Sequence, residues 1–239
     1  MSDDFDQSSG VVARLAEVRA RIAAAEQAAG RAAGSVRLLL ATKTVPTSRV
    51  RAAIAAGVDL IGENRVQELV AKGPELDGVD VEIHLIGHLQ GNKVNPVLRW
   101  ATCVQSVDSL EIATRLAERS ADAGRVLDVM VQVNVSGEDT KYGALPDAAG
   151  DLAREVAALD GLRLTGFMTI GSNSADSGLV RAGYARLREV RDDVVGAATA
   201  RSAHATELSM GMSGDLELAI AEGATIVRIG TAVFGSRPA

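Results

Sequence analysis

Eight short runs rich in leucine and β-branched residues alternate with helical patterns along this 239-residue chain, and this alternation restricts the fold more than any other feature. It is typical of repeated βα units around a parallel sheet. The predicted strands span residues 36–42, 59–62, 82–86, 103–107, 127–135, 163–169, 207–209 and 226–229. An open, doubly wound sheet shows the same alternation, but eight strands favour an α/β fold of the (β/α)8 TIM-barrel type.

Helical patterns fill the intervals between these strands, at residues 48–56, 65–72, 92–98, 110–123, 148–159, 178–195 and 216–222. An extra N-terminal helix is predicted before the first strand, because apolar residues recur at helical spacing over 11–29 and Gly30 follows as a terminator. Residues 1–10 are acidic and polar, and we expect them to be flexible. No Pro- or Ser-rich linker divides the chain, so residues 1–239 are predicted to form a single domain.

The composition is that of a globular protein, with 47% apolar and 23% charged residues. The 25 basic and 31 acidic residues give a net charge of −6, and the scatter of the basic residues argues against nucleic acid as a partner. The single cysteine, Cys103, excludes an intrachain disulfide and indicates a buried thiol in a reducing compartment. The sequence has no apolar N-terminal segment and no membrane-length apolar run, so we expect a cytoplasmic protein that does not bind membranes.

Lys43 stands at the end of the first predicted strand, just before Thr44-Val45-Pro46. The carboxyl ends of strands open onto the binding face of barrels and open α/β sheets. A partly desolvated lysine there can lose its proton and form a Schiff base, which makes Lys43 a candidate covalent anchor for a carbonyl compound. The alternative is a solvated lysine at a strand edge, since lysine is mostly exposed in proteins.

Two neighbouring loops near the carboxyl terminus have the composition of phosphate-binding loops. One contains Met210 and Ser213 between a short strand and a helix, and the other places Gly230 and Thr231 directly after the last strand. Barrels of this type frequently hold a phosphate after strands seven and eight, although each loop alone is also compatible with an ordinary strand-to-helix turn. Arg228 lies among strand residues, so its guanidinium requires a partner, either a ligand or an acidic residue of the barrel.

Other polar residues also follow predicted strands. Asn64 could reach a polar substituent of a bound ring, or it could cap the following helix. His84 and His88 are four residues apart but flank a strand-to-loop transition without a carboxylate set, so no metal site is expected. We expect His84 to point into the barrel beside the ligand and His88 to order its loop, while Lys141 either steers an anion, receives an aldehyde transiently or is a solvated loop residue.

Taken together, these segments resemble the pyridoxal phosphate homeostasis protein family, single-barrel relatives of the alanine racemase N-terminal domain. The resemblance covers residues 38–235, and several ordered motifs are more specific than any one of them. The motifs that carry it are 41–44 (ATKT), 62–68 (GENRVQE), 84–90 (HLIGHLQ), 137–143 (GEDTKYG), 208–213 (LSMGMS) and 227–231 (VRIGT).

The resemblance implies a fold type III barrel in which Lys43 holds pyridoxal 5′-phosphate (PLP) covalently as a Schiff base. It implies further that Ser213, Gly230, Thr231 and the Met210 region receive the phosphate and that Arg228 meets the pyridine nitrogen. The full cofactor-binding set predicted for this chain is Lys43, Asn64, His84, Met210, Ser213, Arg228, Gly230 and Thr231.

Arg228 also bears on activity. An arginine is only a donor, so a pyridine nitrogen facing it must be an unprotonated acceptor, and the ring becomes a poorer electron sink. Racemisation needs a second acid or base, which the resembling racemases supply as a tyrosine of an additional domain. Because the chain ends at Ala239, we expect it to lack that domain, and Tyr142 and Tyr184 lie outside any motif that matches the racemase tyrosine.

We therefore expect a monomeric PLP-binding protein, not an enzyme, that acts in vitamin B6 homeostasis and delivers PLP to apo-enzymes through transient contacts. One alternative is a weak PLP-dependent amino-acid racemase. A third hypothesis is a colourless barrel enzyme that acts on a phosphorylated metabolite, with Lys43 forming a Schiff base to the substrate.

Overall fold

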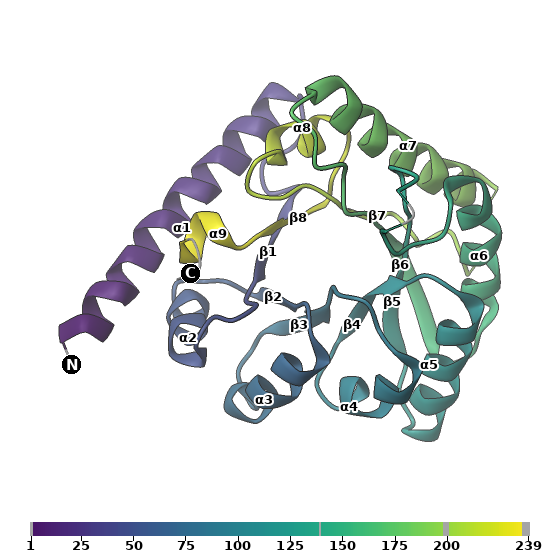
Figure 1. The fold of residues 1–239 in the computed structure, drawn as a ribbon, viewed down its shortest axis with the longest axis horizontal. Coiled ribbons are helices and arrows are strands. Elements are labelled where there is room, and N and C mark those ends of the chain that lie inside the picture. Colours follow the sequence, from purple (N-terminus) through teal and green to yellow (C-terminus); the bar gives the residue numbers. More distant parts are fainter. Residues whose placement is uncertain (1, 139, 198–200, 236–239) are drawn as a thin grey trace.

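A closed barrel of eight parallel strands forms the centre of the molecule (Figure 1). The computed structural model describes residues 2–138, 140–197 and 201–235. Each strand pairs with its neighbour in chain order, and β8 returns to pair with β1, which confirms the predicted barrel and excludes the open sheet. The strands are β1 (Arg37–Ala41), β2 (Leu60–Glu63), β3 (Glu82–Leu85), β4 (Cys103–Val107), β5 (Leu127–Gln132), β6 (Leu162–Met168), β7 (Glu207–Ser209) and β8 (Ile226–Ile229).

The predicted bounds of β4, β7 and β8 are confirmed, and the largest difference lies at β5. The apolar pattern there continues to Val135, but β5 ends at Gln132. Beyond it the chain pairs with a loop residue, because Asn134 N–H donates to the carbonyl of Ala144 and Ala144 N–H donates to that of Gln132. The β-like composition of 133–135 therefore serves a loop contact as well as the barrel, since Val133 N–H still donates to the carbonyl of Met168 in β6 at 2.8 Å.

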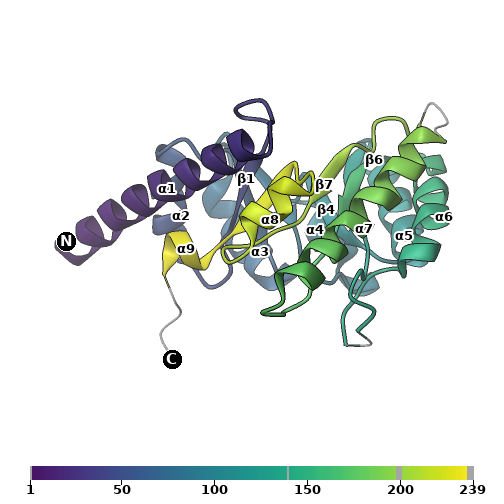
Figure 2. The same cartoon turned by 90° about the horizontal axis from the view of Figure 1, so that it is seen from above.

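Helices cover the outside of the barrel (Figures 1 and 2). The first helix begins at Ser2, nine residues before the predicted start, and packs against α2, α8 and α9; Met1 lies outside the described residues. The sequence did not predict α9, a single turn after β8. Within the described ranges, none of the helices has the length and apolar character needed to cross a bilayer. The helices are α1 (Ser2–Ala28), α2 (Thr47–Ala55), α3 (Val66–Leu76), η1 (Gly91–Lys93, 3-10), α4 (Val94–Leu98), α5 (Leu110–Asp122), α6 (Pro146–Ala158), α7 (Ser177–Gly196), α8 (Leu216–Ala221) and α9 (Thr231–Phe234).

Two separate hydrophobic cores follow from the alternation of side chains along the strands. Leu40 belongs to the large core between sheet and helices, whereas Leu39 belongs to a small cluster with residues from across the barrel. Only the barrel interior can bring residues of opposite strands together, so this small cluster is the interior core. It includes Cys103, which is buried and free, as predicted.

Candidate functional site

A cavity of about 490 Å³ opens at the carboxyl ends of the strands. Six of the eight predicted binding residues line it: Lys43, Asn64, Ser213, Arg228, Gly230 and Thr231. They come from the segments that follow β1, β2, β7 and β8 and from β8 itself, which are distant in sequence and meet only because the barrel closes. The structure thus assembles a lysine amine, a buried guanidinium and two hydroxyl- and glycine-containing loops around one volume.

Met210 does not line the cavity. Its side chain is fully buried in the large core, and Gly211 turns the chain at φ 91°. The next side chain, Met212, is 42% exposed and does line the cavity. The turn at Gly211 therefore places Met212 in the cavity wall, where Met210 was predicted.

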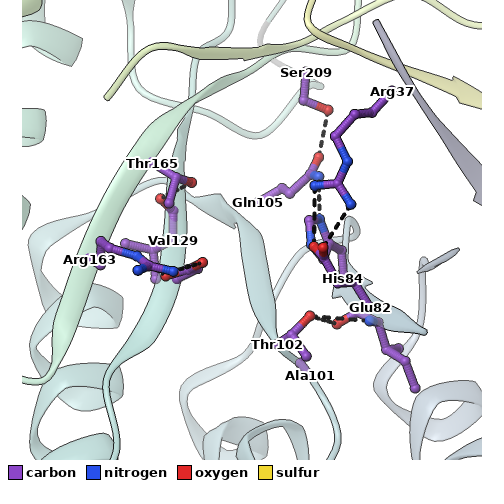
Figure 3. Close-up of polar contacts among 12 residues, drawn as sticks. Arg37, Glu82, His84, Ala101, Thr102, Gln105, Val129, Arg163, Thr165 and Ser209 are labelled. Carbon is purple, nitrogen blue, oxygen red and sulfur yellow. Dashed lines mark hydrogen bonds and ion pairs between the residues drawn. The ribbon is translucent and has the colours of Figure 1, made fainter. Parts of the chain in front are cut away.

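His84 also lies outside the cavity wall and is connected to it through a chain of hydrogen bonds across the barrel interior. Figure 3 shows the part of this chain from Ser209 to Glu82. Arg228 Nη1 donates to Ser209 Oγ at 3.0 Å, and the Ser209 hydroxyl donates to Gln105 Oε1 at 2.6 Å. Gln105 Nε2 then meets His84 Nδ1 at 2.8 Å, and His84 Nε2 meets Glu82 Oε2 at 3.3 Å. We call these five residues the interior chain.

The direction of every hydrogen bond in the interior chain follows from its arginine end. Arginine can only donate, so Ser209 Oγ accepts and must pass its own hydrogen to the Gln105 carbonyl. The Gln105 amide group then faces His84 Nδ1, which leaves the ring hydrogen on Nε2, directed at Glu82. Hydrogen bonds from His84 and from Arg37 lower the pKa of Glu82 to about 2.

Arg228 is a buried cation without a carboxylate partner. Its second nitrogen, Nη2, donates to the carbonyl of Thr169 at 2.7 Å. Among the described residues, no carboxylate oxygen lies within 4 Å of its nitrogens, so the alternative of a structural ion pair is not found. Burial lowers its pKa to about 10, which leaves it charged at neutral pH. A guanidinium has five N–H donors, and Arg228 lines the cavity.

The two predicted phosphate loops touch one another at the cavity. The Thr231 hydroxyl donates to Ser213 Oγ at 3.4 Å, which joins the turn after β8 to the loop after β7. Asp215 holds the latter loop, because its carboxylate accepts from Met212 N–H at 2.6 Å and from the Tyr184 hydroxyl at 2.7 Å. Burial, with Asp215 beside it, raises the pKa of Tyr184, so this phenol stays neutral.

Sequence reasoning missed Arg49, a second arginine in the cavity wall. Its guanidinium donates to the carbonyl of Phe234 at 2.8 Å and lies 5.6 Å from the centre of the Phe234 ring, while its Nε is buried without a partner. Ile86 and Ile170, which also line the cavity, lie within two residues of the ends of β3 and β6 and could have been found by the rule that located Lys43. Arg49 lies inside α2, where no sequence signal marks it.

Lys141 and His88 lie in loops outside the cavity wall. Lys141 Nζ pairs with Glu138 at 2.7 Å and donates to the carbonyl of Gly171 at 3.1 Å; Asp139 of the same motif lies outside the described residues. His88 stacks on Tyr142 with ring centres 3.8 Å apart, in line with a loop-ordering role. Where the chain is described, no three His, Cys, Asp or Glu residues are grouped so as to hold a metal.

The fold and the site define the class of protein. The structure is a parallel eight-stranded barrel with a lysine after β1 and two touching loops after β7 and β8. Residues 14–238 match the family model of the alanine racemase N-terminal domain. A pyridoxal phosphate homeostasis protein of Pseudomonas aeruginosa is 46% identical over 230 residues, which cover 96% of both chains. The chain therefore belongs to the pyridoxal phosphate homeostasis protein family.

Solved structures agree with this assignment. A protein of unknown function from Bifidobacterium adolescentis shares 43% sequence identity and superposes with a TM-score of 0.93, with 96% of each chain covered. PipY of Synechococcus elongatus, whose structure was solved with PLP bound, shares 33% identity with a TM-score of 0.81 over 94% of this chain and 100% of PipY.

Proposed function

We propose that this chain binds PLP in the cavity at the carboxyl ends of the strands and acts in PLP homeostasis. The observation that carries the proposal is Arg228, a buried cation that has no acidic partner in the described residues and faces the same volume as Lys43 and the two loops. A buried charge without a partner is costly, and an acceptor in the cavity would compensate it. The ring nitrogen of PLP is such an acceptor.

The donor set fits the remaining groups of PLP. The Lys43 amine would condense with the aldehyde, releasing one water and forming a Schiff base. Ser213, Thr231 and the backbone at Gly230 would hold the phosphate, and Asn64 would contact a polar ring substituent. The names of the relatives and the PLP-bound PipY structure support this assignment.

We infer a carrier, not an enzyme, because the residues needed for proton transfer are engaged elsewhere. Tyr184 is buried against Asp215, and Tyr142 stacks on His88; neither phenol lines the cavity. A donor-only Arg228 at the ring nitrogen also restrains carbanion chemistry. We propose a monomer that delivers PLP to apo-enzymes in the cytoplasm, where a free buried thiol such as Cys103 is the usual state of cysteine.

Delivery is tested by loading the protein with PLP and mixing it with an apo-enzyme in the presence of a phosphatase that destroys free PLP. Activation that persists under these conditions supports direct transfer, and activation that disappears contradicts it. Lys43→Ala should not load, whereas Lys93→Ala, which changes a lysine outside the cavity wall, should behave as wild type. Turnover of D- or L-amino acids that depends on Lys43 would instead establish the racemase hypothesis.

A further inference from the structure

The backbone on both sides of Lys43 is held by one turn of helix α3. On one side, Lys72 Nζ donates to the carbonyl of Thr42 at 2.6 Å. On the other side, Thr44 N–H donates to Glu68 Oε2 at 2.7 Å. Glu68 and Lys72 are four residues apart on the same face of α3, with 3.7 Å between their charged atoms. The two peptide groups that flank the anchoring lysine therefore share one support.

Glu63, at the end of β2, completes this support. Its Oε1 accepts from Lys72 Nζ at 2.7 Å and from the Thr42 hydroxyl at 2.5 Å, and its side chain is 1% exposed. Burial raises the pKa of Glu63, opposed by the hydrogen bond from Lys72, and its Oε2 is buried without a partner. Such a desolvated carboxylate is costly to keep, and its contacts converge on the backbone before Lys43.

Thr44 shows why the support is needed. It has φ 61°, and among the described residues it is the only non-glycine residue with a positive φ. This conformation is strained for a β-branched side chain and persists only where surrounding contacts impose it. The Thr44 side chain is exposed, so packing does not impose it. Two hydrogen bonds hold it: Val45 N–H donates to the carbonyl of Thr42 at 3.0 Å and closes the turn, and Thr44 N–H donates to Glu68.

We infer that Glu68, Lys72 and Glu63 are positioning residues that set the backbone of Lys43 and so direct its amine into the cavity. The inference rests on the proposed Schiff base with PLP. A lysine side chain has many rotamers, and fixing the peptide groups on both sides of its Cα removes the backbone contribution to that freedom. It also gives Glu63 and Glu68 of the 62–68 motif a role, although neither lines the cavity.

The test combines Glu68→Leu with Thr44→Gly, because glycine adopts a positive φ without strain. The readout is the rate at which PLP forms an adduct that borohydride traps. We expect Glu68→Leu to lower this rate about tenfold, the size that the strain of one left-handed residue gives. Thr44 lines the cavity, so Thr44→Gly alone is the reference for the double variant, and adding Glu68→Leu to it should lower the rate far less than Glu68→Leu lowers it in wild type. Glu75→Leu, on the exposed face of α3, is the matched control.

A second readout needs no PLP. Backbone carbon chemical shifts at residue 44 of the unliganded protein should report the left-handed conformation in wild type and its loss in Glu68→Leu. Glu68→Gln keeps an acceptor oxygen, so it should retain the left-handed conformation of Thr44 and most of the rate of adduct formation. This variant provides the test if Glu68→Leu does not fold.

The outcomes separate this inference from the proposed function. Wild type that traps no adduct contradicts the proposed Schiff base, and the chemical shifts then decide the positioning on their own. Wild type that traps PLP while Glu68→Leu keeps both its rate and the left-handed shifts contradicts the positioning role. A loss of rate from Glu68→Leu that is equally large in Thr44→Gly and in wild type contradicts it as well, because the defect then does not act through the backbone.

Discussion

The interior chain makes a large stability effect predictable at Gln105, which touches no cavity. Gln105 is fully buried and joins Ser209 to His84. Replacement by leucine, of similar size, leaves the Ser209 hydroxyl without its acceptor and His84 Nδ1 without its donor. Each unsatisfied buried polar group costs about 1–3 kcal/mol, so Gln105→Leu should lower the free energy of unfolding by about 2–6 kcal/mol.

Urea unfolding of the unliganded protein at neutral pH, followed by far-UV circular dichroism, measures this loss through the midpoint at constant slope. Gln132→Leu is the matched control, because Gln132 is also buried but its side chain makes one hydrogen bond within the described residues, to the carbonyl of Tyr142 at 2.9 Å. Gln132→Leu should lower the free energy of unfolding about half as much as Gln105→Leu does. A loss below about 1 kcal/mol for Gln105→Leu, or one no larger than that of Gln132→Leu, would refute the reasoning.

Three further predictions concern the cavity and its supports. In Gly87→Ala, a Cβ would stand 1.9 Å from the carbonyl oxygen of Asn64, so the variant should lose about 1–3 kcal/mol of stability and bind PLP more weakly; unchanged urea unfolding would contradict the packing. Ser213→Ala combined with Thr231→Val should weaken binding of PLP but not of pyridoxal, which lacks the phosphate, in a spectroscopic titration; equal losses would exclude the phosphate assignment. Because the pKa of Tyr184 is raised above its ordinary value of 10.0, its contribution to stability is complete below that pH and is lost as the pH rises beyond it; wild type should lose more stability than Tyr184→Phe between pH 9 and about 11, and parallel curves would oppose this.

The barrel could be predicted from sequence because strand runs such as those of β4 and β8 carry their own apolar signal. Lys43, Asn64 and Thr231 could be predicted as site residues because each lies within two residues of the end of a strand, and the carboxyl ends of strands converge in this fold. Contacts between distant segments left no such signal. Arg49 enters the cavity from inside a helix through its contact with Phe234.

His84 shows the limit of the strand rule most clearly. The rule placed its side chain in the barrel but could not show that other polar residues separate it from the cavity. That order depends on how Gln105 and Ser209 meet across the interior, which the closed barrel determines and local sequence does not. The same holds for Met210 and Met212, where a turn at Gly211 decides which side chain faces the cavity.

The central claim is that Lys43 anchors PLP, and borohydride reduction followed by peptide mass spectrometry tests it most directly. The protein is mixed with PLP, its absorbance is recorded, and it is reduced and digested. We predict a near-visible band that disappears on reduction and a single phosphopyridoxyl adduct on the peptide that contains Lys43, absent in Lys43→Ala. A colourless protein without adduct, or an adduct on Lys141 in place of Lys43, would contradict the account.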